Sequence, residues 1–537
     1  MRVLHLDTLF PALLFAPVVW GGTVQLPNLQ VPASAAAHRQ DVVTIFNESY
    51  DAYRHFAFGH DQLNPLSVTV TDPRNGWGAS IVDAMSSMVG DLPFDDFQQA
   101  LAFSSHIDFE ESKVNETVSF FETTIRYVGG LISAYELSGK KYPVLVDQAK
   151  RLADRLSLAF SVENSTFPFG DLDFTSNSVV NETGSIATSG TLTLEWGKLT
   201  EYTGNAAYRA LAEKSVLQIT SNPKPLPGLP AQGLDPNTNL PVGGYVTWGG
   251  GSDSYFEYLI KWARLSNTDD DTFANNWRTA VDTSIKILVK RSTVGNHLYL
   301  ADFDDDRKIR HIGSHLACFY GGNWLLGGKL TNNDTIVNIA LELNEACWNT
   351  YAGDATGIGP EAFAFISPDG NFTGGDAATP AQLAFYREHG YYITDGIYIE
   401  RPEVLESNFY AWRVTGDTKY LDRAASAVAS FNRFLKTPHG FAGFNDVNNV
   451  TSGQVDDMES FWFAEVLKYL YLTFDDPSHI SLDDFVFNTE GHPFIAPPAK
   501  ATYGTGILPP DTTPFTVNPG PLPAVSPIVK LPLPTGV

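Results

Sequence analysis

This chain of 537 residues is poor in basic side chains. Its 35 Lys and Arg stand against 61 Asp and Glu, which gives a net charge of -26. Because nucleic acid is also strongly negative, nonspecific nucleic-acid binding is excluded as a function. The acidity is compatible with a neutral sugar ligand, a cation or an acidic medium. The simpler interpretation is that it only keeps a secreted protein soluble.

Sequence signatures of several common chemistries are also missing. No Gly-x-Ser-x-Gly and no P-loop pattern occurs, so serine hydrolase and nucleotide chemistry lack support. His311 and His315 have the spacing of a helical metal pair. No Glu stands beside His311 and Gly313 weakens a helix there, so we interpret both as core or turn histidines rather than a transition-metal site.

Apolar runs long enough to cross a membrane are absent after the N-terminus. Residues 1–22 combine Arg2, an apolar run interrupted by Pro11 and Pro17, and small residues near Gly21, which predicts a signal peptide. An uncleaved anchor is the alternative. We therefore expect a secreted protein without stable membrane contact, with anchored residence in the Golgi or ER lumen as the alternative.

Glycosylation sequons are frequent, which fits a secretory chain, and only two cysteines are present. The two cysteines, Cys318 and Cys347, are expected to form one disulfide in an oxidising compartment; two buried thiols are the alternative. Seven Asn-x-Ser/Thr sequons lack Pro in the middle and are predicted glycosylation sites. They are Asn47, Asn115, Asn164, Asn181, Asn333, Asn371 and Asn449.

Composition divides the chain into a folded part and a tail. Residues 38–495 are predicted to form one large domain, because barrels often exceed the average domain length. Residues 496–537 are rich in Pro and poor in charge, which predicts an extended or disordered extension.

Helical patterns recur along the folded part. Apolar residues at three and four spacing predict amphipathic helices over residues 81–91, 129–142, 194–208, 255–270, 323–334, 408–420 and 464–476. The predicted turns at their ends are near Gly90, Gly139, Gly204, Asn267, Asn332, Gly416 and Asp475, where Gly or Asn suits a left-handed cap. Seven helix pairs predict an all-α fold, an (α/α)7 barrel; an irregular helical array is the alternative. Residues 245–251 and 296–303 are predicted to form short rim strands or hairpins.

Carboxylates gather at several predicted helix starts. Asp253 and Glu257 are four residues apart, so both lie on one helix face, and Glu403 follows Pro402, where the helix dipole favours a carboxylate. Glycoside hydrolysis needs two carboxyl groups flanking the scissile bond, with neighbouring charges raising the pKa of the acid. A single acid at a helix start is more often a cap. The recurrence favours a hydrolase.

The chain resembles class I α-1,2-mannosidases, glycoside hydrolase family 47. The matching segments are VDAM (82–85), FETTIRYVGGLISAY (121–135), SGTLTLEW (189–196), GGGSDSYFEYLIK (249–261), HLACFYGG (315–322), GPEAF (359–363), RPEVLES (401–407), MESFWFAEVLKYLYL (458–472) and FNTEGHPF (487–494). They run in family order and span nearly all of the folded part.

The resemblance implies an (α/α)7 barrel and a monomeric, inverting exo-α-1,2-mannosidase that trims high-mannose N-glycans. Glu122 is similar to the family's general acid and Glu403 to its base, which acts on water. Asp253 is similar to the third essential carboxylate, as partner or alternative acid. Cys318 and Cys347 match the family's disulfide.

The resemblance also implies a calcium ion. Thr489 matches the family's Ca²⁺ ligand, through its hydroxyl and carbonyl oxygens, and water fills most other positions. The ion would hold two sugar hydroxyls and help to distort the ring. Acidic residues expected around this site, some of them binding sugar hydroxyls or calcium-bound waters, are Asp83, Glu195, Glu257, Glu361, Glu459, Glu465 and Glu490. Arg126 and Arg401 of the matched segments are assigned to substrate binding.

Two positions depart from the family pattern. Ser86 stands where members usually have a second acid after Asp83, which predicts a structural consequence. Gly251 stands two residues before Asp253, where members that stop after one mannose have Arg. We therefore expect broad trimming of several α-1,2-mannoses. The competing hypotheses are a lectin-like, mannose-glycan-binding quality-control protein and a calcium-independent hydrolase of another glycan.

Overall fold

The protein is described by a computed structural model that covers residues 22–88, 94–506 and 514–523. The predicted signal peptide, apart from Gly22, and the predicted turn at Gly90 lie outside these residues. Within the described ranges, none of the helices combines the length and the apolar character that a membrane crossing requires.

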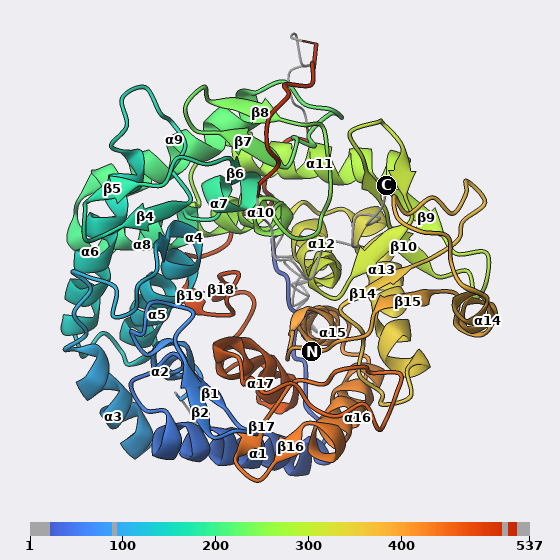
Figure 1. The fold of residues 1–537 in the computed structure, drawn as a ribbon, viewed down its shortest axis with the longest axis horizontal. Helices are drawn as coiled ribbons and strands as arrows, with labels where there is room; N and C mark the ends of the chain where they lie inside the picture. Colours follow the sequence, from blue (N-terminus) through green and yellow to red (C-terminus); the bar gives the residue numbers. More distant parts are fainter. Residues whose placement is uncertain (1–21, 89–93, 507–513, 524–537) are drawn as a thin grey trace, which may run out of the picture.

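Seven helical hairpins form a closed ring, an (α/α)7 barrel (Figure 1). The inner helices are α2 (Ala79–Met85), α5 (Gly129–Leu137), α8 (Thr193–Thr203), α10 (Asp253–Ser266), α12 (Tyr320–Leu330), α15 (Glu403–Thr415) and α17 (Leu467–Phe474). Each packs against the next, and α2 closes the ring against the turn that precedes α17. All seven predicted helical segments fall on these inner helices, so the predicted fold class is confirmed.

The outer helices are buried on one side only. They are α1 (Ala35–Phe56), α3 (Phe94–Ser104), α6 (Val144–Leu156), α9 (Ala206–Ser221), α11 (Thr272–Ile287), α13 (Asp334–Gly353) and α16 (Lys419–Phe434). Close approach between the two rings depends on small residues. A Cβ at Gly327 of α12 would come 2.1 Å from the fully buried indole of Trp277 on α11. Large indoles thus fill the space between the rings.

Five of the predicted turn residues have the expected left-handed backbone. Two of them, Gly139 (φ 69°) and Asn332 (φ 50°), lie two residues after the last residue of α5 and of α12. Gly204, Asn267 and Gly416 end α8, α10 and α15 in the left-handed region, where Gly and Asn are favoured. Asp475 ends α17 in extended conformation instead. Oδ1 of Asp475 accepts a hydrogen bond from Arg39 of α1 (2.8 Å), so an ion pair fixes the end of α17.

Short hairpins cover the ends of the ring. They are β1 (Gln62–Asn64) with β2 (Thr69–Thr71); β3 (Val118–Ser119), β4 (Asp171–Asp173) and β5 (Ser178–Val179); β6 (Gly184–Ser185), β7 (Gly233–Asp235) and β8 (Leu240–Val242); β9 (Val289–Arg291) with β10 (Leu298–Leu300); β11 (Asp302–Phe303) with β12 (Ile309–Arg310); β13 (Ile312–Ser314), β14 (Ala362–Ala364) and β15 (Tyr392–Asp395); β16 (Lys436–Thr437) with β17 (Gly440–Phe441); and β18 (Phe485–Phe487) with β19 (Pro493–Ile495). All pairings within them are antiparallel. Short helices α4 (Phe120–Thr123), α7 (Ile186–Gly190) and α14 (Pro380–His389) complete the fold.

The two predicted rim strands have different outcomes. Residues 296–303 contain β10 and β11, as predicted. The prediction for residues 245–251 is wrong, because only Val246 makes an isolated bridge, to Phe303. Three consecutive glycines follow, and Gly251 has a φ of 81°, so the chain turns there into α10 instead of continuing as a strand.

The disulfide and the sequons have defined positions. Cys318 and Cys347 form the predicted disulfide, which joins α13 to the 3-10 turn before α12. Asn47 on α1 is partly buried, and Asn333 caps α13 by accepting a hydrogen bond from the Ile336 amide (3.1 Å). The other five sequon asparagines are exposed. Their glycosylation stays a prediction.

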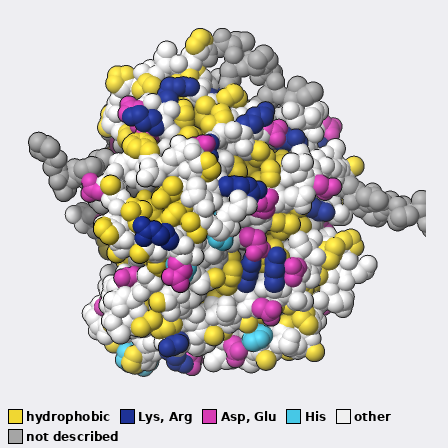
Figure 2. All heavy atoms as spheres, turned by 90° about the vertical axis from the view of Figure 1, so that its right-hand side faces the viewer, with side chains coloured by type: hydrophobic (Ala, Val, Ile, Leu, Met, Phe, Trp, Pro, Cys, Tyr) yellow, Lys and Arg dark blue, Asp and Glu magenta, His cyan; other side chains and the backbone are white. Residues whose placement is uncertain are grey.

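Charges of both signs are mixed over the surface. On the face drawn in Figure 2, Lys and Arg side chains lie among Asp and Glu. Exposed ion pairs such as Arg291–Glu342 (2.6 Å) are worth little stability, because water and salt screen them. The net negative charge therefore does not prevent local pairing.

Candidate active site

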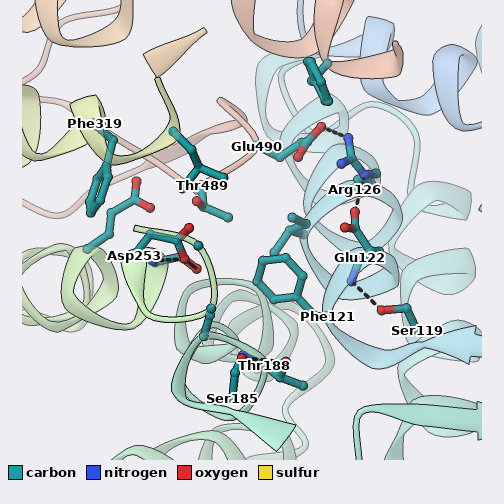
Figure 3. Close-up of a pocket in the computed structure, with 18 of the residues that line it drawn as sticks. Ser119, Phe121, Glu122, Arg126, Ser185, Thr188, Asp253, Phe319, Thr489 and Glu490 are labelled. Atoms are coloured by element: carbon teal, nitrogen blue, oxygen red, sulfur yellow. Dashed lines mark hydrogen bonds and ion pairs between the residues drawn. The ribbon is translucent and has the colours of Figure 1, made fainter. Parts of the chain in front are cut away.

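A cavity of about 430 Å³ lies at the end of the ring where the inner helices begin. Helices α4, α10 and α15 start here with Glu122, Asp253 and Glu403 in their first turns. Figure 3 shows Asp253 on one side of the cavity and Glu122 with Arg126 on the other. The parallel inner helices thus bring together acids from distant parts of the chain.

Glu122 is held between two arginines. Its Oε2 lies 2.7 Å from Nε of Arg126 and 3.2 Å from Nε of Arg74. Burial alone would raise the pKa of Glu122, but the charges and hydrogen bonds of Arg74 and Arg126 outweigh it and lower the pKa to about 2. The expectation that neighbouring charges raise the pKa of the acid is therefore wrong for Glu122, which is ionised in the free site.

Asp253 has the opposite environment. Burial raises its pKa to about 7, and the charges of Glu257 and Glu403 act in the same direction. The amide and hydroxyl of Ser254 donate to Oδ1 (2.7 and 3.1 Å) and oppose this shift without cancelling it. Asp253 can hold a proton in mildly acidic solution.

Glu403 is kept ionised by two neighbours. Nδ1 of His315 lies 2.7 Å from its Oε2, and Arg401 lies 3.7 Å from its Oε1. Burial would raise the pKa of Glu403, but these partners lower it below the ordinary glutamate value. An ionised carboxylate lining a cavity can take a proton from water.

Further acids crowd the cavity wall. Glu257, Glu406, Glu459, Glu465 and Glu490 all line it. Burial raises the pKa of Glu406 to about 8, and burial with the charges of neighbouring acids raises the pKa of Glu465 and Glu490 well above the ordinary value. Without a bound cation, the carboxyl groups of this site therefore cannot all be ionised at once.

Two π-helical turns place side chains on the wall of this cavity. They cover Thr124–Val128, with Arg126, and Trp462–Val466, with Glu465. A π turn widens a helix by one residue and is frequent at functional sites. Arg126 reaches Glu122 and Glu490 from the first of these turns.

Three predicted substrate-binding acids lie behind the wall instead of on it. Asp83, Glu195 and Glu361 do not line the cavity. Asp83 lies 3.5 Å from Arg126, and both carboxylate oxygens of Glu361 accept from the one N–H at Nε of Arg401 (2.8 and 2.7 Å). These two carboxylates support arginines that do face the cavity, because a buried guanidinium needs a counter-charge.

The tip of the β18–β19 hairpin enters the ring with Thr489. Figure 3 shows Thr489 between Asp253 and Glu490. Its hydroxyl makes no hydrogen bond to any residue that the structure describes. Behind it, Glu195 accepts from Tyr258 and Asn488 through Oε1, while its buried Oε2 has no hydrogen-bond partner among the described residues. Unpaired oxygens facing an excess of acid fit a hard cation such as Ca²⁺.

The protein would supply only part of such a coordination shell. Among the described residues, no group of three or more His, Cys, Asp and Glu is arranged to hold a metal. Thr489 would hold Ca²⁺ through its hydroxyl oxygen, and waters and ligand oxygens would have to complete the shell. The surrounding carboxylates would bind those waters.

Aromatic side chains complete the wall. Phe121, Phe319 and Phe461 line the cavity, and Cζ of Arg126 lies 5.6 Å from the centroid of the Phe461 ring. Apolar faces next to hydrogen-bonding acids are what a sugar ring requires, because sugars present both C–H faces and hydroxyls.

The fold and the site define a helical-barrel carbohydrate hydrolase. Residues 45–496 match the sequence profile of glycosyl hydrolase family 47. The chain belongs to this family, so the predicted resemblance is confirmed.

Similar proteins include fungal mannosidases. A probable mannosyl-oligosaccharide α-1,2-mannosidase 1B of Aspergillus clavatus is 37% identical over 514 residues, 90% of this chain and 98% of its own length. Mannosyl-oligosaccharide α-1,2-mannosidase 1B of Aspergillus phoenicis is 38% identical over 491 residues, 87% and 93% of the two chains. The solved α-1,2-mannosidase from Trichoderma reesei superposes with a TM-score of 0.82 at 34% identity, covering 86% of this chain and 99% of that one.

Three residues of the site, two on the cavity wall and one behind it, were not predicted as such from the sequence. His315 was interpreted as a core or turn histidine, yet it contacts Glu403. Arg74 comes from the loop after β2, which has no distinctive pattern. Glu406 lies on the cavity wall within the matched segment 401–407, and no separate role was assigned to it from the sequence. The partner of His311 is Ser367 (2.9 Å), so the interpretation of His311 as a structural histidine agrees with its contacts.

Proposed function

We propose that this protein is a Ca²⁺-dependent, inverting exo-α-1,2-mannosidase that trims several α-1,2-linked mannoses from high-mannose N-glycans in the secretory pathway. The observation that carries the proposal is the divergence of two carboxyl groups in one cavity. Asp253 has its pKa raised to about 7, whereas Glu403 has its pKa lowered. Oppositely tuned acids are the requirement of acid–base glycoside hydrolysis.

Glu403 acts as the base. It is ionised beside His315 and Arg401 and takes a proton from the attacking water. The same water adds to the anomeric carbon as the glycosidic bond breaks, which inverts the configuration.

Proton donation to the leaving oxygen comes from the Asp253 side of the cavity. Asp253 holds a proton at mildly acidic pH, whereas Arg74 and Arg126 keep Glu122 ionised. The family resemblance assigns the acid role to Glu122. The charges around these two residues favour Asp253, with Glu122 orienting the arginines and binding sugar hydroxyls or water.

Thr489 would hold Ca²⁺, and the ion would supply a positive charge that binds sugar hydroxyls and favours a distorted ring. Side chains of the cavity wall make the other contacts with the sugar. Phe319 and Phe461 present apolar faces to the sugar, and Glu257, Glu459 and Glu465 offer hydrogen-bond acceptors for hydroxyls.

The direct test is mannose release from a high-mannose N-glycan, with and without excess chelator, followed by calcium restoration. Release that stops with chelator and returns with calcium is expected. Glycan binding without release under any condition would contradict the enzymatic proposal and favour the lectin-like hypothesis. Release that is indifferent to prolonged chelation and calcium-free dialysis would contradict the calcium assignment.

A further inference from the structure

The C-terminal tail returns to the mouth of the cavity. Residues 497–537 lie beyond the part that matches the family, yet Pro523, the last residue that the structure describes, is buried and lines the cavity. Figure 1 shows the described end of the tail (red) running along β8, β7 and β6 toward the centre of the ring.

The tail contacts both ends of the barrel. Tyr503 donates from its hydroxyl to Asn267 (2.7 Å), at the end of α10 that lies away from the cavity. The Gly243 amide donates to the carbonyl of Asn518 (3.1 Å), and the Asn518 side chain donates to the carbonyl of Pro241 (2.9 Å). Residues 514–523, hereafter the rim segment, are thus fixed on the sheet beside the cavity.

Glycines of the sheet make room for the rim segment. A Cβ at Gly243 would come 2.9 Å from Leu522, and one at Gly233 would come 3.3 Å from Cδ of Pro523. Gly233 pairs with Ser185, which lines the cavity. The rim segment therefore covers the strands that lead directly into the site.

We propose that Pro523 of the rim segment forms a binding surface for the part of the glycan beyond the scissile mannose. This proposal rests on the proposed function. The pyrrolidine ring is rigid and apolar, and the part of it that lines the cavity can contact the C–H side of a sugar. Asp171 and Glu182 line the cavity close to the strands it covers, and their carboxyl groups can accept hydrogen bonds from sugar hydroxyls.

The test compares two substrates in full-length variants. Pro523→Ala is expected to lower kcat/KM for a high-mannose N-glycan about three- to tenfold through KM, since it removes part of one apolar contact. It should leave kcat/KM for α-1,2-mannobiose within about twofold of the unaltered chain, because this disaccharide is too short to extend along this surface. Asn518→Ala, which loses the side-chain anchor of the rim segment, should act in the same direction.

The matched control is Pro521→Ala. Pro521 lies two residues away in the same segment, is exposed and does not line the cavity. It should leave both substrates unchanged. Thermal unfolding of each variant should stay within about 2 °C of the unaltered chain, because the substituted residues lie in the rim segment, outside the barrel core.

Three outcomes would overturn the proposal. They are equal losses on both substrates, an unchanged KM for the glycan in Pro523→Ala, and faster glycan turnover in either variant, which would make the rim segment an obstruction. Failure of the unaltered chain to hydrolyse either substrate would overturn the proposed function instead, and it would be seen before any variant is compared.

Discussion

Nδ1 of His315 lies 2.7 Å from Oε2 of Glu403, and the other ring nitrogen of His315 lies 2.8 Å from the Tyr351 hydroxyl. Tyr351 is fully buried, so the imidazole is fixed on the side away from the cavity. His315 is therefore a positioning residue for the proposed base. It holds the carboxylate in place and keeps its pKa low.

Replacing His315 with Gln should weaken this control. The pKa of Glu403 rises when the histidine no longer stabilises the ionised form, and the base works only when ionised. The acidic limb of the kcat/KM profile should therefore move to higher pH, with kcat down about tenfold or more. His311→Gln is the matched control, since His311 contacts Ser367 and does not line the cavity. An unchanged acidic limb in His315→Gln would argue against the role.

Replacing Glu403 with Gln should remove the base while keeping the shape of the site. Turnover should fall at least about a thousandfold, and glycan binding measured by calorimetry should remain within a few-fold. Circular dichroism checks the fold. Full activity of Glu403→Gln would show that another residue activates the water.

The roles of Asp253 and Glu122 can be separated by pH. If Asp253 holds the proton, activity should decline as pH rises through about 7, because the acid is then deprotonated. Asp253→Asn should abolish this basic limb and lower kcat by roughly 10²- to 10⁴-fold. Glu122→Gln should retain the limb, since Glu122 is already ionised. Loss of the basic limb in Glu122→Gln alone would return the acid role to Glu122.

The sequence predicted the inner helices because each is apolar with helical period. It did not predict how loops complete the site. Arg74 reaches Glu122 because buried Asp61 accepts hydrogen bonds from the amides of Arg74 (2.7 Å), Gly76 (2.8 Å) and Gly78 (3.0 Å), which fixes the loop. Such a contact depends on tertiary folding and leaves no periodic pattern.

The contacts that shift the pKa values of the site acids could not be predicted from the sequence either. Glu403 and His315 are 88 residues apart, and nothing local indicates that the barrel joins them. Asp83 and Glu361 were recognisable as family acids, but only packing reveals that they lie behind Arg126 and Arg401. The sequence motifs therefore identified the acids that line the cavity. The residues behind them, which position those acids and arginines, could be identified only from the structure.

Ser86 replaces the family's second acid beside a buried lysine. Nζ of Lys468 donates to Oγ of Ser86 (2.7 Å) and to the carbonyl of Gly491 (2.7 Å), and burial lowers the pKa of Lys468 to about 7. A small cavity of about 30 Å³ adjoins Ser86 and gives room for a longer side chain. Ser86→Asp should give the ammonium group a direct counter-charge and stabilise the fold by about 1 kcal/mol.

The pH dependence tests this explanation. A folded-state pKa below the unfolded value of about 10.4 means that Lys468 costs stability fully below pH 7, and that this cost is relieved as pH rises toward 10. The gain from Ser86→Asp should therefore be larger at pH 6 than at pH 9 in chemical denaturation. Ser86→Ala, which only removes the hydroxyl, should destabilise. Equal gains at both pH values would contradict the role of Lys468.

Gly251 lies on the cavity wall two residues before Asp253. Because it carries no side chain, the approach to Asp253 stays open, which favours trimming of several mannoses. Gly251→Arg should place a long cation there and restrict the product profile toward removal of one mannose. Its φ of 81° also disfavours a side chain, so a loss of about 1 kcal/mol in stability is expected.

Gly251→Ala shares the backbone cost without the bulk and should keep broad trimming. Oligosaccharide profiling over time distinguishes the two, and identical profiles for Arg and Ala would show that this position does not set how many mannoses are removed.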